Sequence, residues 1–187
     1  MTIDELFPLL PKEGWLEYNE ARLLWDVASA TRGAILEVGT FHGRSTVLLG
    51  TVVKQSIPSR PVYAVDPFAG FNTLDPTGSR AEECLAVNLK HHDLSGCVQV
   101  FRQRIEDWQP LPCGFAYLDG DHDCAGTMRQ IRIALRCGVT DLCLHDYENN
   151  GGGCEIVKAV KASPLNMIQV AGRMAHCRPR IGLKVLG

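Results

Sequence analysis

Two short polar groups carry the residue types needed for acid–base or metal chemistry. The first, Y-L-D-G-D-H-D, contains Asp119, Asp121 and His122, and the second, L-H-D-Y-E, contains His145 and Asp146. Each group closes an apolar run typical of a buried strand. Because the carboxyl ends of parallel strands meet at one edge of a sheet, we expect the two groups to lie together. Crowded carboxylates resist ionisation unless hydrogen-bond donors or a cation stabilise them, and a divalent cation would do so directly.

A glycine-rich turn, E-V-G-T-F-H-G-R-S-T, joins an earlier apolar run to a helical stretch. Gly39 and Gly43 can adopt backbone angles closed to other residues, which lets a ligand approach the backbone and the helix N-terminus. The spacing is G-x-x-x-G and not the G-x-G-x-x-G of dinucleotide-binding folds, and Thr40 replaces the second glycine. The turn therefore argues against NAD. Two glycines in such a turn can also serve packing alone.

An acid ends the next apolar run, Y-A-V-D, at Asp66. At that place a carboxylate can accept hydrogen bonds from both hydroxyls of a ribose. The alternative is a turn former ahead of Pro67. Because the glycine-rich turn and the acid occur in this order, we favour the ribose role.

Short apolar runs alternate with helical stretches, which predicts βαβ units and a parallel sheet. Helices are expected over about residues 17–31, 80–91 and 124–136, with another at E-I-V-K-A-V-K-A-S. The expected strands are residues 34–39, P-V-Y-A-V-D to residue 66, residues 98–101, G-F-A-Y-L-D to residue 119, T-D-L-C-L-H-D to residue 146, and the closing pair N-M-I-Q-V-A-G and I-G-L-K-V-L-G. The predicted fold class is α/β: a Rossmann-like doubly wound sheet of about seven strands, mostly parallel with an antiparallel C-terminal strand, in a single domain over residues 1–187.

The composition is that of an ordinary globular domain, with 45% hydrophobic and 21% charged residues among 187. A formal net charge of −2 argues against a nucleic-acid or membrane partner. The N-terminus does not read as a signal peptide, and the eight cysteines contain no C-x-x-C pair, so we expect reduced thiols and a cytoplasmic protein.

The glycine-rich turn resembles motif I of class I S-adenosylmethionine-dependent methyltransferases, and Y-A-V-D resembles motif II. The resemblance extends over nearly the whole chain and includes the strand count. It implies that the turn holds the methionine part of the cofactor, that the acid of motif II holds the ribose, and that the segment after the third strand contacts adenine. The implied cofactor-binding residues are Glu37, Gly39, Thr40, Phe41, Gly43, Ser45, Asp66, Gln103, Arg104, Ile105 and Asp119. Arg104 is equally compatible with a solvated surface charge.

The two polar groups resemble those of metal-dependent O-methyltransferases, including the catechol and macrolide-sugar enzymes. This implies Asp119, His145 and Asp146 as ligands of a divalent metal, Mg or Mn, and His122 with Asp119 as catalytic residues. The histidine at position 145 departs from the family, which has an acid or amide there. Mg prefers oxygen ligands, whereas imidazole suits Mn, Fe or Zn. Three accounts stay open: a transition metal, a Mg site that uses Asp121 in place of His145, or no metal. For His122, a structural or substrate-orienting role is the alternative.

The expected function is S-adenosylmethionine-dependent methyl transfer to a small hydroxylated acceptor, with sugars and catechol-like rings as the leading classes. The alternatives are a catalytically inactive S-adenosylmethionine-binding protein and a metal-independent methyltransferase, and acceptor atoms other than oxygen stay open. A homo-oligomer is compatible with the sequence. The segments Trp15–Tyr18 and Phe68–Arg80 are candidates to close over the site, with plain surface packing as the alternative.

Overall fold

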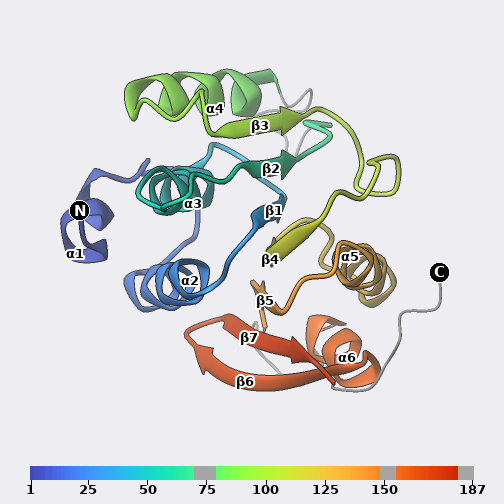
Figure 1. The fold of residues 1–187 in the computed structure, drawn as a ribbon. Helices are drawn as coiled ribbons and strands as arrows, with labels where there is room; N and C mark the ends of the chain where they lie inside the picture. Colours follow the sequence, from blue (N-terminus) through green and yellow to red (C-terminus); the bar gives the residue numbers. More distant parts are fainter. Residues whose placement is uncertain (70–78, 148–154, 181–187) are drawn as a thin grey trace.

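Seven strands form one sheet in the order β3-β2-β1-β4-β5-β7-β6 (Figure 1). This computed structural model describes residues 1–69, 79–147 and 155–180. Only β7 runs antiparallel to its neighbours β5 and β6, and the other pairs are parallel. The predicted mostly parallel sheet with an antiparallel C-terminal strand is confirmed. The elements are α1 (Ile3–Leu6), the 3-10 turn η1 (Phe7–Leu9), α2 (Tyr18–Ala30), β1 (Ala34–Val38), α3 (Arg44–Lys54), β2 (Val62–Val65), α4 (Ser79–His91), β3 (Val98–Phe101), β4 (Cys113–Leu118), α5 (Cys124–Arg136), β5 (Asp141–Leu144), α6 (Glu155–Ala162), β6 (Leu165–Ala171) and β7 (Met174–Pro179).

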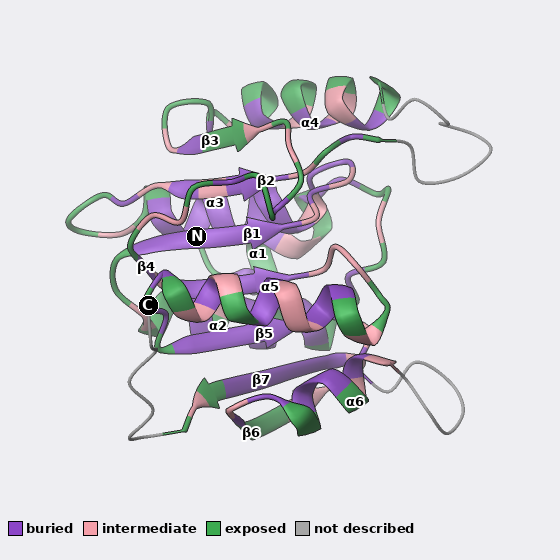
Figure 2. Ribbon diagram, turned by 90° about the vertical axis from the view of Figure 1, so that its right-hand side faces the viewer, coloured by how far each residue is buried: buried purple, intermediate pink, exposed green. Residues whose placement is uncertain are grey.

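Helices cover both faces of the sheet, with α2 and α3 on one face and α5 and α6 on the other (Figure 1). Each face has its own hydrophobic core, and the residues of α4 join the core formed by α2 and α3. The central strands β1 and β5 are buried along their whole length, as expected for parallel strands covered on both sides (Figure 2).

The closing hairpin differs from the prediction in its second strand. It pairs β6 with β7, which spans Met174–Pro179, whereas the sequence pattern predicts that strand at residues 181–187, outside the described residues. The stretch M-A-H-C-R-P contains no β-branched residue, but His176 and Cys177 are buried in a strand that lies between β5 and β6. Pairing on both sides therefore overrides the local composition.

Among the described residues, no helix has the length and apolar character needed to cross a bilayer. The seven described cysteines are all free thiols.

The direction of winding reverses between β1 and β4. From β1 the chain proceeds through β2 to β3 on one side, and β4 then returns to pair with β1 on the other. Ligands of doubly wound sheets bind outside the carboxyl ends of the strands at such a reversal. The fold therefore places the residues after β1, β2, β4 and β5 around one site.

Candidate active site

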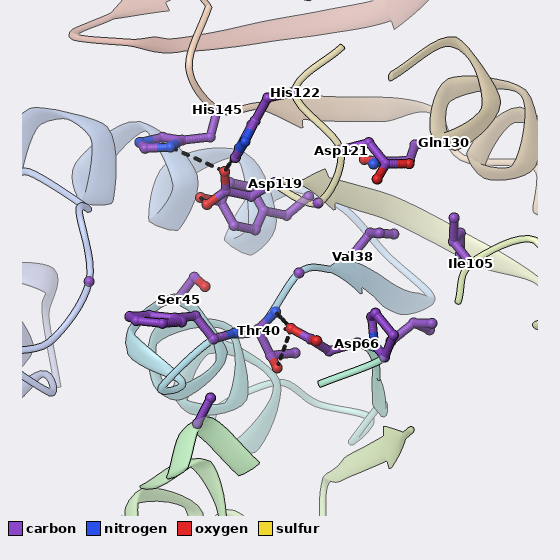
Figure 3. A pocket seen from close by; sticks show the side chains of 18 of the residues that line it. Val38, Thr40, Ser45, Asp66, Ile105, Asp119, Asp121, His122, Gln130 and His145 are labelled. Atoms are coloured by element: carbon purple, nitrogen blue, oxygen red, sulfur yellow. Dashed lines mark hydrogen bonds and ion pairs between the residues drawn. The ribbon is translucent and has the colours of Figure 1, made fainter. Parts of the chain in front are cut away.

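A cavity of about 470 Å³ opens at this reversal, within the size range of small-molecule sites (Figure 3). Its walls come from the segments after β1, β2, β3, β4 and β5, and from the segment before α2. Trp15 and Phe41 stack at its mouth with ring centroids 5.4 Å apart, which supports the expectation that the segment before α2 closes one side. Of the loop expected over Phe68–Arg80, residues 70–78 lie outside the described residues.

The two glycines of the turn are required by the protein itself. Gly39 has a φ of +84°, and a Cβ there would lie 2.3 Å from the carbonyl oxygen of Asp119. Gly43 has a φ of +89°, and a Cβ there would lie 2.6 Å from a methyl carbon of Leu85. Both positions are in the left-handed region that favours glycine. Both positions therefore require glycine because of their backbone angles and close packing, independently of any ligand. This close packing also fixes the start of α3 beside the cavity.

Asp66 ties the turn to the end of β2 (Figure 3). Its Oδ2 atom accepts hydrogen bonds from the backbone N–H of Thr40 at 2.8 Å, the Thr40 hydroxyl at 3.1 Å and the backbone N–H of Phe41 at 3.1 Å. Its Oδ1 atom accepts one bond, from the N–H of Phe68 at 2.8 Å. A carboxylate has about four acceptor positions, two on each oxygen. Asp66 is thus a turn residue, and Oδ1 keeps acceptor capacity toward the cavity that it lines.

Glu37 is the second-last residue of β1, next to the turn, and is fully buried. Its Oε1 atom accepts a hydrogen bond of 2.6 Å from the Ser45 hydroxyl, while Oε2 has no hydrogen-bond partner. Burial disfavours the charged form and raises the pKa of Glu37 to about 8, although the Ser45 hydroxyl opposes the shift. At neutral pH this side chain is therefore mostly a neutral carboxylic acid.

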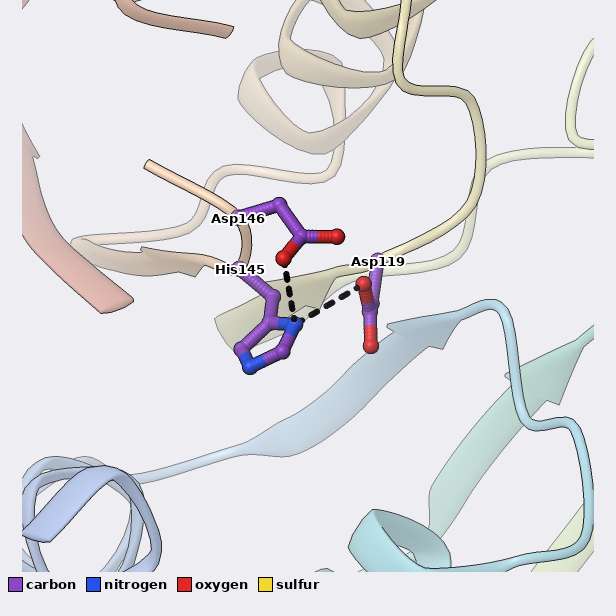
Figure 4. A group of neighbouring side chains, drawn as sticks. All are labelled: Asp119, His145 and Asp146. Carbon is purple, nitrogen blue, oxygen red and sulfur yellow. Dashed lines mark ion pairs between the residues drawn. The ribbon is translucent and has the colours of Figure 1, made fainter. Parts of the chain in front are cut away.

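The residues after β4 and β5 do come together, as predicted. His145 Nδ1 lies 3.3 Å from Asp119 Oδ1 and 3.7 Å from Asp146 Oδ1 (Figure 4). His122 Nε2 lies 3.5 Å from Asp119 Oδ1 and 3.4 Å from Asp146 Oδ2. The His122 side chain is 43% exposed, whereas that of His145 is 3% exposed. His122 is therefore the histidine that a bound molecule can reach.

Two residues that sequence reasoning missed complete this cluster. Glu20 of α2 is fully buried, and its Oε2 lies 3.3 Å from Nε2 of His145. Its Oε1 accepts a hydrogen bond of 2.8 Å from the backbone N–H of Arg173, in the turn between β6 and β7. The Arg173 guanidinium donates to Asp146 Oδ1 at 3.0 Å. The sequence could have pointed to Glu20 only through its position on the apolar face of α2, where a charged side chain needs a buried partner.

The carboxylates of this cluster are paired with histidine and arginine side chains. Burial disfavours a charged His145, but hydrogen bonds with Asp119 and Glu20 outweigh burial and raise its pKa to about 10. A hydrogen bond with Asp119 likewise raises the pKa of His122. Burial acts to raise the pKa of Asp119, but hydrogen bonds from the two histidines lower it overall. The carboxylates are thus stabilised by imidazolium and guanidinium groups, so their crowding does not by itself require a metal.

Most of the predicted cofactor residues line the cavity: Gly39, Thr40, Phe41, Ser45, Asp66, Arg104, Ile105 and Asp119 do, whereas Glu37, Gly43 and Gln103 do not. Glu37 accepts a hydrogen bond from Ser45 at the start of α3, and Gly43 is the turn residue that caps this helix. Asp123 caps α5 by accepting a hydrogen bond from the backbone N–H of Gly126. For Asp119, His145 and Asp146, one ligand atom from each lies within 4.8 Å of the others, which is close enough for the three to bind one metal ion.

The family model for a methyltransferase domain matches residues 36–146. Comparison with curated proteins found no match. The fold is similar to that of the O-methyltransferase TomG from Streptomyces achromogenes in complex with S-adenosylmethionine, with 15% identity over 95% of this chain and 86% of that one and a TM-score of 0.65. It is also similar to an O-methyltransferase from Bacillus cereus in complex with S-adenosylhomocysteine, with 15% identity, coverage of 94% and 90%, and a TM-score of 0.61. The chain has the Rossmann-like fold of class I S-adenosylmethionine-dependent methyltransferases and belongs to the methyltransferase domain family.

Proposed function

We propose that this protein transfers the methyl group of S-adenosylmethionine to a hydroxyl of a small acceptor, with His122 as the general base. The observation that carries this proposal is the position of His122, whose Nε2 lies between Asp119 and Asp146 on the cavity wall and whose side chain is partly exposed. The structural neighbours named above are O-methyltransferases, and so is CalS11, a TDP-rhamnose 3'-O-methyltransferase whose structure has 16% identity and a TM-score of 0.60. These support oxygen as the acceptor atom.

The residues present suit the cofactor. Thr40, Phe41 and Ser45 would border its methionine part, and Asp66 Oδ1 would accept from the ribose hydroxyls. The bound cofactor supplies an electrophilic methyl group on its sulfonium. The protein then has to exclude water, hold the acceptor hydroxyl in line at about 3 to 3.5 Å from the methyl carbon, and remove the hydroxyl proton.

His122 removes that proton. Its neutral imidazole accepts the acceptor's proton, and the resulting imidazolium is stabilised by the carboxylates of Asp119 and Asp146. The same carboxylates raise its pKa, so the neutral form becomes available only at higher pH than for an ordinary histidine. His145 cannot take this role, because it is buried between Glu20 and Asp119.

A second candidate is the same transfer assisted by a divalent metal at Asp119, His145 and Asp146. It is favoured by the 4.8 Å spacing and by Glu20, which would orient His145 through its other ring nitrogen, as carboxylates do for metal-binding histidines. A site of two oxygen ligands and one imidazole suits Mn better than Mg. A metal there would lower the pKa of the acceptor hydroxyl.

The first test is calorimetric titration of the protein with S-adenosylmethionine and S-adenosylhomocysteine, followed by transfer of a labelled methyl group to sugars and catechols. Micromolar binding and transfer to oxygen are expected. If neither ligand binds, the proposal is overturned. Titration with Mn and Mg, and turnover after treatment with a chelator, distinguish the two candidates: loss of turnover that Mn restores would favour the metal-assisted one.

A further inference from the structure

One buried side chain on the cavity wall has no role in the chemistry described so far. Gln130 of α5 is only 2% exposed and lines the cavity (Figure 3). Within the described part of the chain, its amide takes part in no hydrogen bond. The amide lines the cavity, so its donors and acceptor are open to a molecule bound there.

The glycine at position 120 leaves room for the Gln130 amide. A Cβ at Gly120 would lie 2.9 Å from Nε2 of Gln130 and 3.1 Å from a methyl carbon of Val38. Any side chain at position 120 would therefore press on the amide. Val38 and Ile105, which are both buried, line the same cavity and give it apolar walls (Figure 3). A planar ring that packs against Val38 and Ile105 would present its edge to the Gln130 amide.

This part of the cavity is separate from the acid–base cluster. Figure 3 shows Gln130 and Ile105 toward one end of the cavity, and His145 and Ser45 toward the other. The amide of Gln130 offers one acceptor oxygen and two N–H donors. The complementary ligand is planar, with apolar faces and an edge on which an amino donor lies beside a ring-nitrogen acceptor. Adenine has that edge, and glutamine and asparagine pair with it through two hydrogen bonds.

We propose that Gln130 recognises the amino edge of the adenine of the cofactor and makes the site selective for adenine over a purine without the amino group. This inference rests on the proposed function, because it takes S-adenosylmethionine as the cofactor. It adds a residue on α5 to the expected adenine contacts after β3, of which Gln103 does not line the cavity.

The test measures the affinity of wild type and Gln130→Leu for two ligands by calorimetry. The ligands are S-adenosylhomocysteine and its 6-deamino analogue, which carries purine in place of adenine. Two lost hydrogen bonds should weaken binding of S-adenosylhomocysteine to the variant about tenfold, but binding of the analogue by less than about threefold. Gln109→Leu, at an exposed position that does not line the cavity, is the matched control and should leave both affinities unchanged. An equal loss for both ligands, or no loss for either, overturns the proposal.

Two further measurements keep the proposal separate from its alternatives. Without ligand, Gln130→Leu should unfold at about the same temperature as wild type, because within the described residues the amide makes no hydrogen bond that the substitution would remove. A clear fall would show that Gln130 is structural and would overturn the proposal. Wild type alone should bind the 6-deamino analogue about tenfold more weakly than S-adenosylhomocysteine. If wild type binds neither ligand, the proposed function fails instead.

Discussion

The buried carboxyl of Glu37 makes the stability of this protein depend on pH in a direction opposite to that of an ion-paired acid. Its pKa lies at about 8 in the folded protein, against 4.5 for an ordinary glutamate. Between these values the unfolded chain loses a proton that the folded protein retains. The folded state then binds more protons, so the free energy of unfolding falls as pH rises through this window and levels off above the folded pKa.

Glu37→Gln removes this dependence, because a neutral amide replaces a group that must stay neutral in the fold. The linkage relation gives a gain of about 1 kcal/mol at about pH 5 and of about 4 kcal/mol at about pH 7.5, a difference of about 3 kcal/mol. Gln at this position can still accept the hydrogen bond from Ser45. The absolute gain depends on how well the amide fits, but the change with pH does not.

The assay is urea unfolding of both proteins at the two pH values, with the same buffer and salt. The exposed Glu83→Gln variant is the control and should show the pH dependence of wild type. The reasoning is refuted if wild type and Glu37→Gln lose or gain stability in parallel between the two pH values. In that case the carboxyl is ionised in the fold and its charge is balanced by groups other than those described.

Three other perturbations test the site. His122→Asn should lower the turnover number by about 10²- to 10⁴-fold in a methyl-transfer assay while calorimetry shows the same affinity for S-adenosylhomocysteine, and unchanged turnover would exclude His122 as the base. Gly39→Ala should lower the free energy of unfolding by about 3 kcal/mol or more, because its Cβ would meet the Asp119 carbonyl at a positive φ, and thermal unfolding that matches wild type would contradict this. Glu20→Gln should cost about 3 kcal/mol in urea unfolding, since it leaves the buried His145 charge with one fewer partner, whereas a stability equal to wild type would mean that His145 is neutral.

The sequence pattern predicted the parts of the fold that depend on local order. Three strands end just before the acids at which the predicted apolar runs end, Asp66, Asp119 and Asp146. These strands were predictable because an apolar run followed by a turn is a local signal. The meeting of Asp119 with His145 and Asp146 followed from the rule that parallel strands share a carboxyl edge.

Other parts of the site depend on distant pairs that no local pattern records. Glu20 and His145 are 125 residues apart in the sequence, and Gln130 looks like an ordinary polar residue of a helix. The G-x-x-x-G spacing of the turn also does not reveal that Gly39 packs against the backbone of Asp119. The closing strand at Met174–Pro179 was missed for the same reason, since its neighbours, and not its composition, make it a strand.

The double contact of Glu20 has a consequence for how the protein forms during synthesis. Glu20 lies in the second helix, and its partners His145 and Arg173 are 125 and 153 residues further along the chain. The glycine-rich turn, Asp66 and the segment after β3 can assemble once the first hundred or so residues have left the ribosome, because they need only local βαβ pairing. The contact between Glu20 and His145 needs only the chain up to β5, whereas the contacts of Arg173 with Glu20 and Asp146 need the β6–β7 turn. A nascent chain stalled before β6 would therefore lack the guanidinium that pairs with Asp146, and completion of the last hairpin is the step that adds this positive charge to the cluster.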